Sequence, residues 1–333
     1  MSNTETRPDE VECRAGDVRD GVEILAPRDV PLGGPRAMLV RRTLPQRERS
    51  LIGAWCFLDH YGPDAVADSG GMSVAPHPHT GLQTVSWLFT GEIEHRDSVG
   101  THAMVRPGEV NLMTAGRGIS HSEVSTPATT TLHGAQLWVA LPAAHRDTAP
   151  AFAHHVPPVV HEPGVEARVF LGSLLGSTSP VATFTPLLGA ELVLEPGATI
   201  PLEVDPTFEH GVLVDLGDVT VDGVAAGRGD LAYVAPERRS LTLVAGPEGA
   251  RVLVLGGPPF GEAIVMWWNF VGRSHEDVVA YRAAWQEQVT AGTDTVVGDS
   301  QEVAPGRFGV VVGDHLPPIP APVLPNARLR ERR

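Results

Sequence analysis

The sequence predicts an all-β protein with two domains, and three observations support this fold class. Glycine and proline are abundant, at 36 and 30 residues, and both residue types mark turns between short strands. Short apolar runs rich in β-branched and aromatic residues alternate with these turns along most of the chain. At 333 residues, the chain is also longer than one hydrophobic core usually serves. We therefore expect two sandwiches or barrels of short strands.

The first domain is expected to span residues 21–145. It follows a polar N-terminal segment, residues 1–20, that is predicted to be flexible. Residues 82–90 and 135–141 are predicted to be strands because apolar, β-branched and aromatic residues dominate both segments. Strands of this kind, separated by turns at regular intervals, are typical of a β-sandwich or β-barrel.

Residues 146–165 are expected to connect the two domains as an extended segment, because several prolines interrupt them and proline cannot donate to a β-ladder. A second domain, at 166–290, is predicted to repeat the architecture of the first. It contains no His-x-His pair. His210 directly follows Glu209, so on a strand these two side chains would point to opposite faces. We predict that His210 is a surface or hydrogen-bonded residue and not a metal ligand.

One helix and a C-terminal arm complete the predicted fold. Ser274 is a suitable N-cap, and Asp277 occupies the position of the acidic partner in a capping box. Apolar residues then recur at spacings of three and four and predict one buried stripe: Val278, Tyr281, Trp285 and Val289. The Pro-rich segment 291–333 contains Phe308, and we expect an extended arm that packs over the body, with disorder as the alternative.

Two short motifs in the first domain contain the candidate functional residues. They are PHPHTG, with His77 and His79, and GISHSE, with His121 and Glu123. On a strand, residues i and i+2 share a face, so two adjacent strands could present three imidazoles and one carboxylate to one ion. This ligand set suits a divalent transition metal such as Fe, Mn, Zn, Ni or Cu. The alternative is ordinary hydrogen-bonded histidines, since a chain with 14 histidines can contain a His-x-His pair by chance.

The charge and the cysteine content restrict the partners and the compartment. The formal net charge is -15, which disfavours direct nucleic-acid binding because such binding neutralises phosphates with basic side chains. Cys13 and Cys56 offer no disulfide framework, which fits a reducing compartment. We expect neither a signal peptide nor a membrane span. The sequence therefore predicts a cytoplasmic protein that acts as a monomer and does not bind membranes.

With its two motifs in this order, the sequence resembles the pirin family, a branch of the cupin superfamily. The resemblance covers roughly residues 20–290 and is strongest in 52–125, which include PHPHTGLQTVSWLFTGEIEHRDSVG and GRGISHSE. It implies two antiparallel cupin-type β-barrels, a bicupin, with a degenerate C-terminal barrel. It also implies one metal ion, most often iron as Fe(II), in the N-terminal barrel only. The ligands that the resemblance implies are His77, His79, His121 and Glu123.

One residue departs from the general cupin pattern. Cupins usually have a carboxylate a few residues after the His-x-His pair, where this chain has Gln83. Pirins share this departure, because the Glu of their second motif supplies the carboxylate. Gln83 would keep the inward parity of the two histidines and is predicted to hydrogen-bond near the metal.

The family suggests two activities, and the metal motif alone does not decide between them. Some bacterial pirins resemble quercetin 2,3-dioxygenases, which open a flavonol ring with O₂, and in this case Glu123 would be the general base. Animal pirins are iron-dependent co-regulators of transcription factors, so the alternative is a regulatory module or redox sensor with a protein partner. His95 is interpreted as a structural strand residue, with substrate contact as the alternative. Four apolar residues would either line a substrate pocket or belong to the barrel core: Val85, Trp87, Leu112 and Met113.

Overall fold

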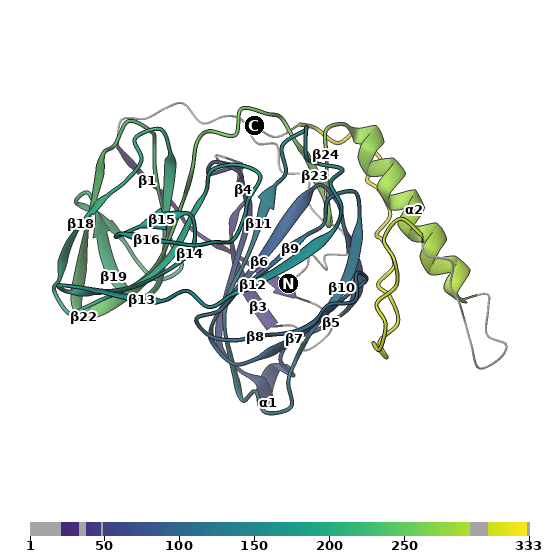
Figure 1. Cartoon of the computed structure of the whole chain (residues 1–333), viewed down its shortest axis with the longest axis horizontal. Coiled ribbons are helices and arrows are strands. Elements are labelled where there is room, and N and C mark those ends of the chain that lie inside the picture. Colours follow the sequence, from purple (N-terminus) through teal and green to yellow (C-terminus); the bar gives the residue numbers. More distant parts are fainter. Residues whose placement is uncertain (1–20, 33–37, 48, 294–305, 332–333) are drawn as a thin grey trace.

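The computed structural model describes residues 21–32, 38–47, 49–293 and 306–331. Within these residues the fold consists mainly of strands, which form two bodies that lie side by side in Figure 1. Helix α2 (His275–Thr293) lies on the outer flank of one body. The predicted all-β fold with two domains and a C-terminal helix is therefore confirmed. The segment 1–20, which was predicted to be flexible and contains Cys13, lies outside the described residues.

The N-terminal domain is a sandwich of two antiparallel sheets. The larger sheet has the order β12-β9-β6-β11-β4-β3-β2, formed by Ala151–His155, Val110–Thr114, Leu82–Thr90, Thr131–Ala140, Trp55–Ala65, Met38–Leu44 and Arg28–Leu32. The smaller sheet has the order β5-β10-β7-β8, formed by Ser73–His79, Ile119–Ser125, Ile93–Asp97 and His102–Val105. Helix α1 (Val66–Ser69) follows β4. Phe57, Met113 and Trp138 of the larger sheet pack against Ile119 of the smaller one, so these apolar side chains fill the space between the sheets.

The chain passes from one sheet to the other directly after the first histidine motif. Strand β5 ends at His79, and β6 begins three residues later in the other sheet. Gly81 makes this corner with a φ of 68°, and a Cβ at this position would collide with the carbonyl oxygen of Val271. The Gly81 N–H donates to the Gly116 carbonyl at 2.8 Å, which ties the corner to the loop before β10. Only glycine fits this corner, which places the histidine motif at the end of β5.

The C-terminal domain is built around one strongly curved antiparallel sheet. Its order is β1-β21-β19-β22-β17-β14-β13, formed by Val22–Leu25, Leu231–Val234, Glu209–Val221, Ser240–Gly257, Leu188–Leu194, Val165–Leu171 and Val159–Glu162. Strands β18 (Thr199–Glu203) and β20 (Val224–Ala226) pair with β22 and β19. Two-residue strands β15 (Ser173–Leu174) and β16 (Ser177–Thr178) form a small ladder. Register shifts bend β19 against β22, so the sheet curves around an apolar interior.

The segment 146–165, predicted to be an extended connector, contains two strands. Strand β12 pairs with β9 of the N-terminal domain, and β13 pairs with β14 of the C-terminal domain. Pro157 and Pro158 lie between these strands, so they remove no hydrogen bond from either ladder. The segment is therefore extended, but each half is paired in the sheet of one domain, because the prolines lie outside the two strands.

Two segments, β1 and the hairpin of β23 (Val265–Trp267) and β24 (Phe270–Gly272), contact the domain that is farther away in sequence. Strand β1 pairs with β21, with Val22 opposite Val234, and so belongs to the C-terminal sheet. Conversely, the β23–β24 hairpin contacts the N-terminal domain through a bridge between Phe270 and Thr80, the residue after β5. A strand-like sequence pattern does not specify which sheet the strand joins, so the sequence could not predict either exchange.

The helix and the C-terminal arm confirm their sequence-based predictions. Ser274 and Asp277 form the reciprocal capping box, since each backbone N–H donates to the side chain of the other residue. The predicted stripe packs in one apolar cluster with the buried Phe308 of the arm. The arm also contacts the smaller sheet, because the Ile319 N–H donates to the Pro76 carbonyl at 2.8 Å. Residues 306–331 therefore lie along the outside of β5 and β10, as Figure 1 shows.

An apolar interface joins the two domains. Val85, Trp87 and Leu112 belong to one cluster with Phe170 and other apolar residues of the C-terminal domain. The Trp87 ring stacks on the Phe170 ring at 4.5 Å, and its Nε1–H donates to the Glu191 carboxylate at 3.0 Å. These residues form the core between the domains, so the alternative in which Val85, Trp87 and Leu112 line a substrate pocket was wrong.

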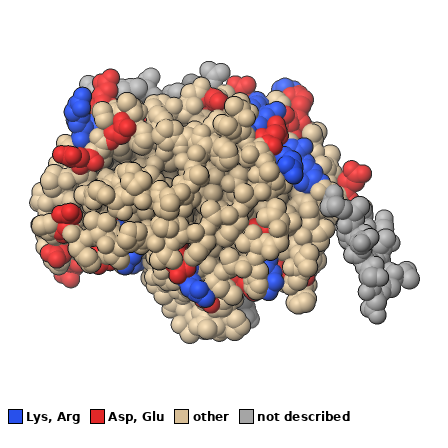
Figure 2. All heavy atoms as spheres, in the orientation of Figure 1, with Lys and Arg blue, Asp and Glu red and all other residues tan. Residues whose placement is uncertain are grey.

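The charged side chains do not form one uniform patch on the face that Figure 2 shows. Acidic and basic groups lie there in small mixed clusters, mainly toward the ends of the molecule, although the chain has a formal net charge of -15. No helix among the described residues is long and apolar enough to cross a membrane.

Candidate metal centre

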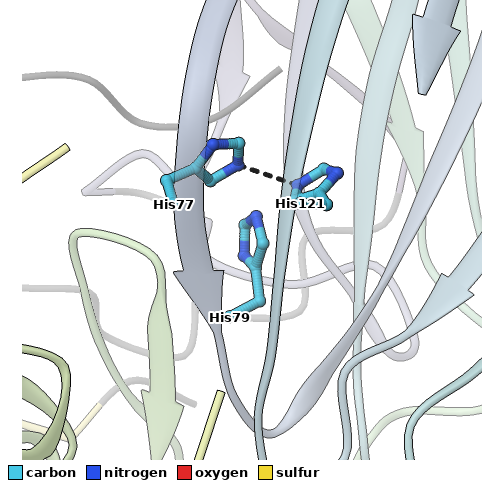
Figure 3. Close-up of side chains that lie close together, drawn as sticks. All are labelled: His77, His79 and His121. Atoms are coloured by element: carbon cyan, nitrogen blue, oxygen red, sulfur yellow. Dashed lines mark hydrogen bonds between the residues drawn. The ribbon is translucent and has the colours of Figure 1, made fainter. Parts of the chain in front are cut away.

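The two histidine motifs meet on adjacent strands of the smaller sheet. Strand β10 runs antiparallel to β5, and His121 lies directly opposite His77 in the ladder. His79 follows two residues after His77, and the three rings point toward one another in Figure 3. One ring nitrogen of each histidine lies within 4.8 Å of the other two, and the Nε2 atoms of His77 and His121 are 2.7 Å apart. The structure thus brings together the three histidines predicted from the sequence.

Glu123, the predicted fourth ligand, is buried beside His121. A register shift after His121 places Glu123 opposite Val74 on β5, while on the other side Glu123 lies opposite His95 of β7. A Glu123 carboxylate oxygen lies within 4.8 Å of ring nitrogens of both His95 and His121. Glu123 and His95 therefore form a second group of potential ligands that shares His121 with the first. The four-residue ligand set stays a prediction.

Burial keeps the three histidines of the first group neutral. Their side chains are at most 1% exposed, and burial lowers the pKa of His77 to about 4. Burial also lowers the pKa of His79 and His121 well below the usual value, and the neighbouring His77 adds to both shifts. A neutral imidazole is the form that binds metals, because a protonated ring has no lone pair to offer.

The hydrogen bonds of these rings also fit metal binding. The Nδ1–H of His77 donates to the Ala75 carbonyl at 2.8 Å, so the neutral ring carries its lone pair on Nε2, which faces His121. Neither ring nitrogen of His79 has a hydrogen-bond partner with normal geometry among the described residues. Leaving a buried polar group unsatisfied costs about 1–3 kcal/mol. A divalent cation would supply the missing partner, and the donor set therefore fits a transition metal.

Aromatic side chains line the inner side of the centre. The Trp138 ring meets the His79 ring edge-on at 5.2 Å, and Phe57 stacks on Trp138 at 4.0 Å. Met113 packs in the same cluster, so its predicted place in the barrel core is confirmed. These residues exclude water from the side of the histidines that faces the larger sheet.

Gln83 does not contact the histidines in the way that its parity predicts. Its side-chain amide donates to the Thr114 hydroxyl at 2.9 Å, and Gln83 shares its strand face with Val85, which points toward the C-terminal domain. The corner at Gly81 moves the chain into a different sheet and resets which positions face inward. The predicted hydrogen bond near the metal therefore has no counterpart among the described residues.

A second buried histidine cluster escaped the sequence analysis. The Nε2 atoms of His60 and His133 lie 2.6 and 2.5 Å from the Oδ1 atom of Asp215, which comes from the C-terminal domain. Arg251 donates to the other carboxylate oxygen at 2.5 Å. Although burial alone would raise it, bonds from the two histidines hold the pKa of Asp215 below its usual range. These residues lie far apart in sequence without a shared motif, so no sequence signal identifies them.

The prediction that His210 is a surface or hydrogen-bonded residue was wrong. The side chain is fully buried in the C-terminal domain, and neither ring nitrogen has a hydrogen-bond partner among the described residues. Burial lowers its pKa to about 4, with a small opposing effect from Asp205. His210 belongs to none of the described groups with metal-binding geometry.

Comparison with known proteins identifies the family. Residues 37–139 match the family model described as Pirin, and residues 189–291 match the Pirin C-terminal cupin domain. A Pseudomonas aeruginosa protein named "Putative quercetin 2,3-dioxygenase PA1205" is 44% identical over 96% of this chain and 98% of its own length. A pirin-like protein of Caulobacter vibrioides is 38% identical over 74% of this chain and 88% of its own length.

The solved structures include a similar protein of nearly the same length. A quercetin 2,3-dioxygenase from Acinetobacter baumannii is 36% identical, with a TM-score of 0.83 over 94% of this chain and 98% of that chain. Together with the two family matches, this similarity confirms the predicted pair of cupin domains.

Proposed function

The chain belongs to the pirin family, and we propose that it is a mononuclear metal-dependent dioxygenase acting on a flavonol-type small molecule with O₂. Two similar proteins are named as quercetin 2,3-dioxygenases, which supports this reaction class. The observation that carries the proposal is the convergence of three buried, neutral imidazoles whose ring nitrogens lie within 4.8 Å of one another.

In the proposed centre, His77, His79, His121 and Glu123 hold one ion. Fe(II) is the first candidate, and Mn, Zn, Ni and Cu are the alternatives for a site of imidazoles and one carboxylate. The metal, when bound, supplies Lewis acidity and open coordination positions for small molecules.

The residues of the chain would position the substrate and move its proton. Glu123 lies at the edge of the histidine group, and its carboxylate would accept the proton of the substrate hydroxyl as general base. Trp138 and Phe57 would exclude water from the inner side of the centre. The contribution of a positioned general base is typically about 10²–10⁴-fold in rate.

Metal analysis combined with an aerobic quercetin assay tests this function. We expect the purified protein to bind about one metal ion per chain and to consume quercetin and O₂ together. His79→Ala should lose the metal and the turnover while the far-ultraviolet circular dichroism stays unchanged. His102→Ala is the matched control, because His102 lies on the same sheet but is 48% exposed.

Full metal loading without turnover of quercetin or related flavonols would contradict the enzymatic proposal. It would favour the alternative function, a metal-dependent regulatory module or redox sensor that acts through a protein partner. A wild-type protein that takes up none of the five metals would contradict both functions.

A further inference from the structure

A chain of hydrogen bonds leads away from the candidate metal centre on the far side of His121. The Nδ1 atom of His121 lies 3.4 Å from the Nδ1 atom of His95, and the Nε2 atom of His95 lies 3.3 Å from the Asp97 carboxylate. His95 and Asp97 are 3% and 2% exposed, so water does not compete for these bonds. Both residues lie on β7, which pairs with β10.

We propose that His95 and Asp97 are positioning residues that fix the tautomer and the ring orientation of His121 for metal binding. This proposal rests on the proposed metal site. His121 faces His77 with its Nε2 atom, which is the atom that would bind the ion. The proton of the neutral ring then sits on Nδ1 and is donated to Nδ1 of His95. The remaining N–H of His95 donates to Asp97, so each of these two hydrogen bonds has one donor and one acceptor.

The three histidines of the centre are held in different ways, which explains why His121 needs this support. His77 is oriented by the backbone, through its bond to the Ala75 carbonyl. His79 makes no hydrogen bond of normal geometry among the described residues and packs against Trp138, with the Asn269 backbone as a polar contact. His121 is linked to the Asp97 carboxylate through His95. Partners of this kind raise the basicity of a ligand, and their loss typically reduces metal affinity by about 10- to 100-fold.

The far end of the chain is anchored by the turn between β7 and β8. One carboxylate oxygen of Asp97 accepts the backbone N–H groups of Val99 and Thr101, at 3.0 and 2.9 Å. The other oxygen remains for His95. The Phe152 ring of β12 covers the His95 ring at 4.9 Å. These contacts fix the orientation of the His95 ring, which in turn orients the His121 ring.

A direct bond from His95 to the ion is the competing explanation, because His95, His121 and Glu123 also form a group with metal-binding geometry. The two explanations predict different metal binding by the His95→Gln variant. A positioning residue can be replaced by glutamine, which can accept a hydrogen bond from His121 and donate one to Asp97. A ligand cannot be replaced in this way without changing the coordination.

The test measures the affinity of full-length variants for Co²⁺ and Zn²⁺ by competition with a chelator, together with the visible spectrum of bound Co²⁺. We expect His95→Leu and Asp97→Asn to weaken binding by about 10- to 100-fold at an unchanged stoichiometry. His95→Gln should recover most of the affinity, with the Co²⁺ spectrum of the wild type. His102→Gln, on the neighbouring strand β8, should change nothing.

Two results would overturn the proposal. Unchanged metal affinity in both His95→Leu and Asp97→Asn would show that His95 and Asp97 do not position His121. Loss of stoichiometric binding in His95→Gln, with an altered Co²⁺ spectrum in any residual complex, would make His95 a ligand. Because the readout is affinity and not turnover, a protein that binds metal without degrading quercetin contradicts the proposed dioxygenase and leaves this proposal intact.

Discussion

The N-terminal domain contains two buried histidine clusters, and they differ in how their polar atoms are satisfied. In the group of His77, His79 and His121, imidazole nitrogens face other imidazole nitrogens, and His79 has no hydrogen-bond partner with normal geometry among the described residues. In the other cluster, His60 and His133 both bond to the carboxylate of Asp215. The first cluster has no carboxylate among its three histidines, whereas the second cluster contains the Asp215 carboxylate.

Arginines complete the second cluster, in which ligand atoms of His60, His133 and Asp215 also lie within 4.8 Å of one another. Arg41 approaches Nδ1 of His60 at 3.3 Å, and Arg251 approaches Nδ1 of His133 at 3.4 Å. Since arginine only donates, both Nδ1 atoms accept, and both Nε2–H groups donate to Asp215. The difference teaches that the proximity of histidines is insufficient to identify a metal site. The balance of donors and acceptors separates a metal site from a polar network that joins two domains.

The largest effect that tests this comparison is expected for Asp215→Ala. Its removal leaves two buried N–H groups without an acceptor and Arg251 without its counter-charge. Breaking a buried ion pair in this way typically costs about 3–5 kcal/mol of the unfolding free energy. Urea unfolding measures this loss, and the metal content of the folded variant should equal that of the wild type.

Glu203→Ala is the control for this variant, because Glu203 is an exposed carboxylate of the same domain. A loss below about 1 kcal/mol in Asp215→Ala, the range typical of exposed ion pairs, would show that the second cluster does not stabilise the fold. If the folded Asp215→Ala variant lost its metal, the ion would bind at the second cluster and not at His77, His79 and His121.

The ability of the sequence to predict the two clusters differs for a physical reason. The His-x-His and His-x-Glu spacings are local, and strand periodicity alone places each pair on one face. In the second cluster His60 and Asp215 are 155 positions apart in sequence, and their contact depends on how the two domains pack. The same limit explains the errors at Gln83 and Val85. Both lie on one face of a strand, as predicted, but the corner at Gly81 moves that strand into another sheet, where this face no longer points toward the histidines.

The second prediction concerns His210, a buried histidine that belongs to neither cluster. Its pKa is about 4 in the folded protein, below the ordinary value of 6.5. The unfolded chain therefore takes up a proton first, so stability present above pH 6.5 is lost as the pH falls toward 4. This difference corresponds to about 3 kcal/mol. His210→Leu should remove this loss.

The measurement is the unfolding free energy of His210→Leu and the wild type at pH 7 and pH 4.5, both in the presence of a chelator. Relative to the wild type, the variant should gain about 2–3 kcal/mol at the lower pH. His161→Leu is the control, because His161 lies in the same domain and is 74% exposed. A parallel pH dependence of His210→Leu and the wild type would contradict the assignment of this loss to His210.

The smallest effect on folding is expected at the metal centre itself, in His79→Leu without metal. Leucine fills a similar volume, and the change removes a buried polar ring that has no hydrogen bond of normal geometry among the described residues. The unfolding free energy should therefore stay within about 1 kcal/mol of the wild-type value, or rise. Added metal should stabilise the wild type, in proportion to the logarithm of its concentration, but not the variant. If metal-free His79→Leu lost as much stability as Asp215→Ala, the two clusters would both be structural networks, and the donor-acceptor argument for a metal at His79 would fail.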